Sequence, residues 1–319
     1  MLLQRVAVLD LGSNTVKLLV AERMRGNEPR ALLEKSATTR LGEKMHRQSR
    51  LPESAMRRSL RAVGAFRRSC EKLRVRQWRA IATSAVRDAT NRGEFEKRFR
   101  ALMGFNLRVL SGKEEARLNF LAAISDPNLI QRGHPVLVMD SGGGSAQWIL
   151  GVPGKTGSAS GGIKQCVSLD LGAVRMTRRF LRGDPHTEHS FHALISHYKK
   201  NLRRLRSAFR VPRSTLLIGT GGGITTAAAL WNSTFRVPRS AFGNWSVHGC
   251  KLTTADLESL LEKLRVMTQA QRLRLKGLPR DRADIITAGV ALFVVAMKTL
   301  EISELRVSLR GLRYGVLIT

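Results

Sequence analysis

Two short stretches of the chain combine an acidic residue with a tight glycine or serine turn between apolar runs. In the first, residues 6–20, VAVLDLGSNT precedes VKLLV. In the second, residues 136–150, VLVMDSGGGS precedes AQWIL. Each pattern predicts a β-hairpin whose tip carries an aspartate and exposed backbone N–H groups. Such a tip can bind phosphate oxygens, and its aspartate can hold a cation beside them.

The turn residues of both hairpins are candidates for binding phosphate. They are Gly12, Ser13 and Asn14 in the first turn and Gly142, Gly143, Gly144 and Ser145 in the second. Glycine lets an anion approach the backbone closely because no Cβ intrudes, and serine adds a hydroxyl donor. Either turn alone could be an ordinary hairpin that uses Asp and Gly for geometry. The recurrence of the pattern favours a phosphate site.

A third glycine-rich turn, residues 219–223 (GTGGG), follows an expected strand at 215–218 and leads into an expected helix. Its candidate phosphate-binding residues are Gly221, Gly222 and Gly223. Their N–H groups would act together with the N-terminus of the helix. The alternative is a strand-to-helix turn in which the glycines only allow close packing.

Length and cysteine usage limit the class of protein. A chain of 319 residues favours two domains. Its three cysteines form no CxxC pair, which argues for a reducing compartment and against a disulfide framework or structural zinc. The N-terminus enters a strand at once, so we expect no secretory signal and a cytoplasmic protein. The longest apolar run, residues 285–297, is too short to span a bilayer and predicts a buried helix.

The charge of the chain is strongly positive. It has 55 basic and 24 acidic residues, a net charge of +31. A field of that size attracts polyanions such as nucleic acid, polyphosphate or anionic lipid. Solvated, arginine-rich helix faces are an equally good explanation, so nucleic-acid binding is possible but not required.

The order of patterns along the chain predicts an α/β protein with duplicated domains. Each half starts with one of the hairpins and continues with alternating strands and helices. We expect an N-terminal domain at 1–128 and a C-terminal domain at 129–319, whose last residues cross back to the first domain. A connector rich in glycine and serine, residues 154–162, follows the second hairpin.

Many short motifs in a fixed order make the chain resemble the exopolyphosphatase / guanosine pentaphosphate phosphohydrolase family. They are Asp10–Asn14, Thr83–Asp88, Ser111–Arg117, Asp140–Ser145, Leu171–Arg175, Gly219–Gly223, Asp281–Asp284 and Ser308–Gly315. The family is a branch of the actin–Hsp70–sugar kinase superfamily. The resemblance implies two duplicated RNase H-like (actin-like ATPase) domains with a cleft between them, in the short form that lacks a C-terminal helical extension.

The resemblance also implies roles for particular side chains. Glu115 would orient or deprotonate the attacking water, and Arg87 would bind substrate phosphate. Asp140, with Asp10, would bind Mg²⁺ or another divalent cation. Without the resemblance, Glu115 would be a solvated acid in the first turn of a helix, and Arg87 would form a surface ion pair with a neighbouring acid.

Glu114 has a structural explanation of its own. The spacing Ser111-x-x-Glu114 predicts a capping box at the start of the helix that follows residue 111. Glu115 lies about 100° further round such a helix, so its side chain does not take part in the capping box and is free to face the cleft.

The leading functional hypothesis is a Mg²⁺-dependent exopolyphosphatase that removes the terminal phosphate of linear inorganic polyphosphate. The first alternative is removal of the 5′-phosphate of guanosine pentaphosphate (pppGpp) in the stringent response, which would use the same atoms. An ATP-dependent kinase and a non-catalytic polyanion-binding signalling protein are further alternatives. A homodimer is also possible.

Two positions depart from the family pattern. Leu309 follows Ser308 where an acidic residue is common, and Tyr314 stands where glutamate is common. We expect these changes to affect the floor of the cleft or the domain hinge and to leave the candidate catalytic set intact.

Overall fold

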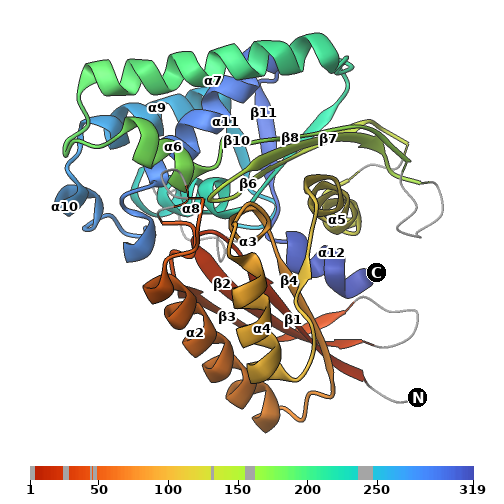
Figure 1. Ribbon diagram of the computed structural model, residues 1–319. Coiled ribbons are helices and arrows are strands. Elements are labelled where there is room, and N and C mark those ends of the chain that lie inside the picture. Colours follow the sequence, from red (N-terminus) through yellow and green to blue (C-terminus); the bar gives the residue numbers. More distant parts are fainter. Residues whose placement is uncertain are drawn as a thin grey trace. The chain divides into compact units, whose positions relative to one another are not determined.

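The computed structural model divides the chain into two compact units (Figure 1). It describes residues 4–23, 29–43, 45, 49–130, 133–154, 162–235 and 247–319, so residues 155–161 of the expected connector lie outside the described part. Unit 1 comprises Met1–Ala122 and Leu312–Thr319, and unit 2 comprises Ala123–Gly311. The chain therefore leaves unit 1 once and returns to it for its last residues.

Unit 1 is built on a five-stranded sheet with the order β3-β2-β1-β4-β5. Its strands are β1 (Gln4–Leu11), β2 (Thr15–Arg23), β3 (Arg30–Thr38), β4 (Gln77–Ala82) and β5 (Arg108–Val109). Its helices are α2 (Glu53–Lys72), α3 (Ser84–Arg87), α4 (Arg92–Met103), α5 (Gly112–Ile124) and α12 (Leu312–Ile318). β1, β2 and β3 are antiparallel neighbours, whereas β4 and β5 run parallel to β1.

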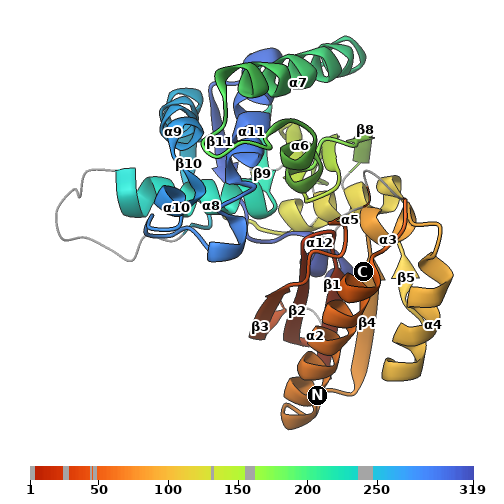
Figure 2. The same ribbon diagram turned by 60° about the vertical axis from the view of Figure 1, so that its left-hand side comes forward.

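β1 is apolar from Val6 to Leu9 because both faces of the sheet are covered there. Leu9 belongs to a core that includes Phe66 of α2 and Phe95 of α4, and these two helices lie side by side in Figure 1. Figure 2 shows the same helices from another side, with β4 between them in that view. Its neighbour Val8 belongs to another core with Val316 of α12. Successive strand residues point to opposite faces, so a strand between two helix layers needs apolar residues at every position.

Unit 2 is built on a six-stranded sheet with the order β10-β11-β9-β6-β7-β8. Its strands are β6 (Val136–Ser141), β7 (Ala146–Val152), β8 (Gly162–Leu169), β9 (Leu216–Thr220), β10 (Lys251–Thr253) and β11 (Glu304–Val307). Its α-helices are α6 (Ala173–Phe180), α7 (Glu188–Ala208), α8 (Gly222–Leu230), α9 (Thr254–Val266), α10 (Gln269–Arg272) and α11 (Ile286–Leu300). A π-helical turn (Trp231–Phe235) and a 3₁₀ turn (Arg280–Arg282) complete the list.

α11 is the central helix of unit 2. Its residues 286–297 are all buried, and it packs against α6, α7, α8 and α9. This confirms the buried helix predicted for the longest apolar run. Within the described ranges, no helix combines the length and the apolar character that crossing a membrane requires.

The two units repeat one topology, which agrees with the predicted duplication. In each unit a hairpin and a third antiparallel strand come first (β1-β2-β3 and β6-β7-β8), and a later strand (β4 or β9) pairs in parallel with the first strand of the hairpin. The sequence did not predict α6, which is short and rich in arginine. A helix of eight residues is not stable alone, and burial of Val174 and Met176 stabilises it.

Candidate functional site

The first hairpin tip joins β1 to β2 in unit 1. The N–H of Gly12 donates to the carbonyl of Thr15 at 3.2 Å and closes the turn. Ser13 Oγ lies 3.0 Å from Ser84 Oγ. Because Ser84 opens α3 and Arg87 ends it, the tip and the predicted phosphate-binding arginine are held by neighbouring elements.

The carbonyl groups of this tip are bound by the segment that follows β3. The carbonyl of Ser13 accepts from the N–H of Gly42 at 2.8 Å. The carbonyl of Asn14 accepts from the N–H groups of Thr39 (3.0 Å) and Arg40 (2.9 Å). Within the described part of the chain, no hydrogen bond uses the N–H of Ser13 or Asn14. These donors are therefore available to an anion.

The carbonyl groups of the second tip, in unit 2, are also bound by N–H groups of another segment. The N–H of Gly142 donates to the carbonyl of Ser145 at 3.0 Å and closes the turn. Residues 172–175 then donate three N–H groups to the carbonyls of residues 142–144. The three pairs are Ala173 to Gly142 (3.0 Å), Arg175 to Gly143 (3.1 Å) and Gly172 to Gly144 (3.2 Å). Both tips thus have their carbonyl side occupied and their N–H side left for a ligand.

Gly172 permits this close approach of two backbone segments. A Cβ at this position would lie 2.5 Å from the carbonyl carbon and the oxygen of Gly143, so no larger residue fits without displacing the tip. Gly42 occupies the corresponding place in unit 1, where a Cβ would lie 3.1 Å from the Cβ of Ser13.

Two segments, residues 39–42 and residues 172–175, hold the glycine tips through hydrogen bonds, and no role was predicted for them. They are called the fastening segments below. A signal for them exists, because a buried leucine directly precedes the critical glycine of each. The pairs are Leu41-Gly42 after β3 and Leu171-Gly172 after β8. The Leu-Gly pair repeats at the equivalent place in both units, as the hairpins do.

Asp10 and Asp140 occupy equivalent positions in the first strand of each hairpin, and each is only 9% exposed. Burial raises the pKa of Asp10, and the nearby cations Lys17 and Arg313 partly offset the rise. Among the described residues, nothing donates a hydrogen bond to the buried Oδ1 of Asp10. An unpaired buried carboxylate oxygen is unfavourable, so Asp10 is suited to bind a cation.

The third glycine turn packs against Asp140. Gly221 has a φ of +89°, a left-handed conformation that favours glycine. A Cβ there would lie 2.5 Å from the carbonyl oxygen of Ser141 and 2.7 Å from Oδ1 of Asp140. Close packing therefore explains Gly221. Gly222 and Gly223 form the first turn of α8, whose N-terminus is next to the same aspartate.

Arg282 was not assigned to the site from sequence. Its guanidinium lies over Gly222, where an added Cβ would overlap it. Burial lowers the pKa of Arg282, and its guanidinium has no hydrogen bond or ion pair within the described ranges. A desolvated guanidinium beside a glycine loop is a good phosphate ligand. Arg282 lies within the Asp281–Asp284 motif of the family resemblance, but no role was predicted for it.

Arg87 and Glu115 form a partly buried ion pair in unit 1. Nη1 of Arg87 lies 3.3 Å from Oε2 of Glu115 and also donates to the carbonyl of Leu110 at 3.2 Å. Nε of Arg87 donates to Asp88 at 3.2 Å, so the expected surface pair is present as well. Glu115 is only 5% exposed and is therefore not a solvated first-turn acid.

Glu114 forms the predicted capping box with Ser111. The N–H of Ser111 donates to Oε2 of Glu114 at 2.9 Å, and the N–H of Glu114 donates to Oγ of Ser111 at 3.2 Å. The hydrogen bonds from Ser111, together with one from Arg108, lower the pKa of Glu114 to about 2. Because Glu114 caps the helix, Glu115 is left to pair with Arg87.

Asp10 in unit 1 and Asp140 in unit 2 are each the kind of residue that binds Mg²⁺ as part of a phosphate complex. Across the described ranges, no three His, Cys, Asp or Glu side chains gather into a metal-binding group. Mg²⁺ in phosphate-handling proteins usually takes one or two carboxylates and completes its coordination with water and phosphate oxygens. The unpartnered oxygen of Asp10 is the kind of ligand that such a complex needs.

The departure at Leu309 leaves its surroundings in unit 2 intact, because this residue contributes through its backbone. Its side chain is 50% exposed, while its N–H donates to Nδ1 of His248 at 3.1 Å. Nε2 of His248 lies 2.5 Å from Oδ2 of the buried Asp126. Nε of Arg310 lies 3.4 Å from the same oxygen. Tyr314, the other departure, packs against a core of unit 1.

Paired glycine tips with aspartates, on duplicated α/β units, define a phosphate-handling protein. The sequence matches the Ppx/GppA phosphatase family over residues 19–319. It is 31% identical over 301 residues to exopolyphosphatase 2 of Mycobacterium tuberculosis, covering 91% of this chain and 88% of that protein. An exopolyphosphatase structure from Cytophaga hutchinsonii has 26% identity and a TM-score of 0.85, covering 98% of this chain and 96% of its own. The Ppx/GppA family member of Aquifex aeolicus has 28% identity and a TM-score of 0.78, covering 99% and 97%.

The chain therefore belongs to the Ppx/GppA phosphatase family. This confirms the resemblance inferred from the motifs and the α/β fold with duplicated actin-like domains. It also confirms the expected class of enzyme, a phosphoanhydride hydrolase. The roles of individual site residues stay predictions.

Gly172→Ala should displace the second tip. The added Cβ overlaps the backbone of residues 143–144, so we expect kcat/KM for phosphate release to fall by about tenfold or more as the N–H groups move. Gly162→Ala is the matched control in the same unit, because a Cβ there meets nothing within 4 Å. Steady-state assays of both variants test this, and equal activity would show that the fastening is not needed.

Glu114 should make stability depend on pH in the acid range. Its pKa is about 2 in the fold against an ordinary value of 4.5. A group whose folded pKa is lowered stabilises the fold above its unfolded pKa, and this stabilisation is lost as the pH falls to the folded value. We expect the advantage of the native chain over Glu114→Gln, about 1 kcal/mol at most for so exposed a side chain, to vanish between about pH 4.5 and pH 2.

Urea unfolding of both proteins across that range measures this advantage. A difference in unfolding free energy that does not change with pH would contradict the assignment.

Proposed function

We propose that this chain is a Mg²⁺-dependent exopolyphosphatase that removes the terminal phosphoryl group of linear inorganic polyphosphate. The partly buried pair of Arg87 and Glu115 carries the proposal. It combines a carboxylate that can orient or deprotonate water with a guanidinium that can bind the phosphate under attack. The name of the Mycobacterium tuberculosis relative supports the choice of substrate.

Phosphate binding falls to the glycine tips. The N–H groups of Ser13 and Asn14 in unit 1, and those of residues 143–145 in unit 2, would bind phosphate oxygens. Gly222 and Gly223 at the start of α8, with Arg282 above them, would add a further donor group. Catalysis of this kind consists of positioning and charge neutralisation and needs no covalent intermediate.

Mg²⁺ would be held by Asp140 and Asp10 and would neutralise charge on the phosphate oxygens. The protein contributes by burying both carboxylates, so that little water competes with the cation for them. Burial raises the pKa of Asp10, and binding of a cation would favour its ionised form.

In the hydrolytic step, water attacks the terminal phosphorus and Glu115 accepts its proton. The bridging P–O bond breaks, the shortened chain leaves with the bonding electrons, and orthophosphate is released. Arg87 would neutralise charge on the transferred group. The hydrogen bond from Arg87 to the carbonyl of Leu110 would keep the guanidinium in place. The contact of Arg87 with Glu115 would then be replaced by a contact with a phosphate oxygen.

Hydrolysis of the 5′-terminal phosphate of pppGpp is the second candidate, because the matched family includes GppA and the same atoms would serve. The net charge of +31 favours the polymer. A long polyanion gains from an extended basic surface, whereas a nucleotide gains only locally.

Glu115→Gln should lower kcat for phosphate release from long-chain polyphosphate by about a hundredfold or more and leave KM nearly unchanged, because the base is lost while the binding groups remain. The assay compares polyphosphate, pppGpp and ATP in parallel with Mg²⁺. Glu114→Gln is the control, since it removes the adjacent carboxylate and keeps Glu115.

An equal loss of activity in both variants would assign the effect to the helix start rather than to Glu115. Preference for pppGpp would exchange the two candidate substrates and keep the mechanism. Tight polyphosphate binding without phosphate release from any of the three compounds would refute the hydrolase and leave a binding protein.

Asp140→Asn should raise the Mg²⁺ concentration needed for half-maximal activity by about tenfold or more, because a charged ligand becomes neutral. Glu304→Gln, an exposed acid of unit 2 that pairs with Lys251, serves as the control. Mg²⁺ titrations of activity measure the shift. A half-maximal concentration that is the same in both variants would exclude Asp140 as a cation ligand.

A further inference from the structure

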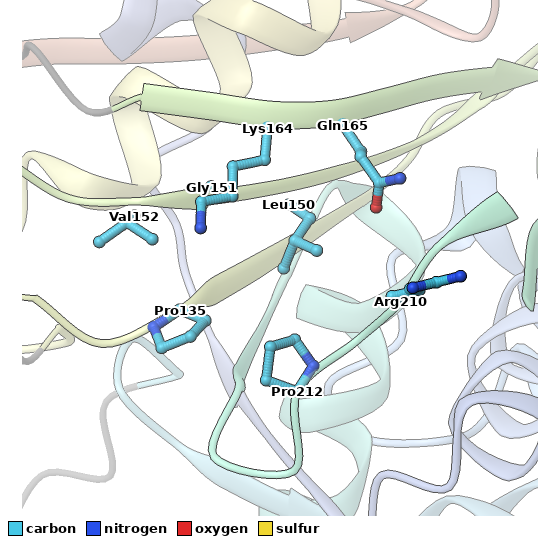
Figure 3. A pocket seen from close by; sticks show the side chains of 8 residues that line it. All are labelled: Pro135, Leu150, Gly151, Val152, Lys164, Gln165, Arg210 and Pro212. Atoms are coloured by element: carbon cyan, nitrogen blue, oxygen red, sulfur yellow. The ribbon is translucent and has the colours of Figure 1, made fainter.

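Unit 2 contains a cavity of about 380 Å³ at the end of its sheet that lies away from the glycine loops (Figure 3). It is lined from the start of β6, the end of β7, the start of β8 and the loop between α7 and β9. Pro135 of its wall precedes β6, and Asp140 lies five residues further along. At roughly 3.3 Å per residue the two are about 17 Å apart, so the cavity is separate from the second phosphate tip.

A β-bulge brings two successive residues of β8 to this cavity. Leu150 pairs with Gln165, and the next pair is Gly151 with Ile163, so Lys164 has no residue opposite. Neighbouring side chains on a regular strand point to opposite faces, and a bulge changes that direction. Lys164 and Gln165 both line the cavity, and Figure 3 shows both side chains extending from the strand towards it.

The cavity combines two cations with an apolar wall. Lys164 reaches it from β8 and Arg210 from the loop after α7. Neither side chain has an ion pair or hydrogen bond to any residue in the ranges that the structure describes. The apolar wall consists of Leu150, Val152, Pro135 and Pro212. Lys164 and Arg210 are both exposed, so they attract anions from solvent, and the apolar wall favours a ligand that is also partly apolar.

We propose that this cavity binds a small organic anion, such as an aryl phosphate or an aromatic carboxylate. Its anionic group would lie at one of the two cations, Lys164 or Arg210, which Figure 3 shows at opposite ends of the cavity. Its apolar body would lie against Leu150 and the prolines, and Gln165 would supply a neutral donor. The volume is at the lower end of the range for small-molecule sites, about 300–1,000 Å³, which suits a single ring with one anionic group. Inorganic polyphosphate has no apolar part and does not match this site.

The test titrates the full chain with four probes, and ligand-observed NMR measures the binding of each. Phenyl phosphate and benzoate carry both features, phenol lacks the charge, and inorganic phosphate lacks the apolar body. The cavity variant is Lys164→Gln with Arg210→Gln. Its matched control is Lys199→Gln with Arg203→Gln, which removes the same charge from two exposed residues of α7 outside the cavity.

We expect saturable binding of phenyl phosphate or benzoate to the native chain and the control, with a Kd at least about tenfold higher in the cavity variant. Whichever probe binds more tightly identifies a phosphomonoester or a carboxylate as the anionic group. Phenol and inorganic phosphate should bind this site at least about tenfold more weakly.

Three outcomes would each overturn the proposal. They are binding of neither anionic probe, binding that the cavity variant leaves unchanged, and a cavity-dependent affinity for inorganic phosphate equal to that of the organic probes. Phosphate release from polyphosphate should be the same in the cavity variant and the native chain. This assay separates failure of the present inference from failure of the proposed function.

Discussion

The glycine tips depend on where their peptide carbonyls find hydrogen bonds. A peptide group is a rigid dipole, so fixing its oxygen on one side aims its N–H to the other. Residues 39–42 do this for the first tip and residues 172–175 for the second. Without these partners the same turns could present carbonyl oxygens, which repel phosphate. The anion binding proposed for the tips would therefore depend on two segments that need not touch the anion.

The sequence predicted the parts of this arrangement that depend on local periodicity and spacing. The hairpins follow from apolar runs broken by turn residues, and the Glu114 cap follows from a spacing of three residues. The fastening of residues 142–144 by 172–175 joins segments about thirty residues apart, and no local pattern encodes such a contact. Arg282 was missed for the same reason, because its burial over Gly222 is a tertiary property.

Several charged groups are desolvated here against the interest of stability. Asp10 has a buried unpaired oxygen, Arg282 is a partly buried cation, and Glu115 is only 5% exposed. Removing charges from water is unfavourable even when they are partly paired. Such groups interact strongly with an incoming phosphate and cation because little water competes with them. The arrangement fits an enzyme that keeps its binding groups ready before substrate arrives.

The contact between Leu309 and His248 has an evolutionary consequence. Since the donor is the main-chain N–H, any residue other than proline supplies it equally well. A change of side chain at position 309, other than to proline, would therefore keep this hydrogen bond to His248. A substitution at such a position looks like the loss of a motif when sequences are compared, although the interaction persists. A main-chain hydrogen bond such as that from the N–H of residue 309 can thus be kept although the residue type has changed.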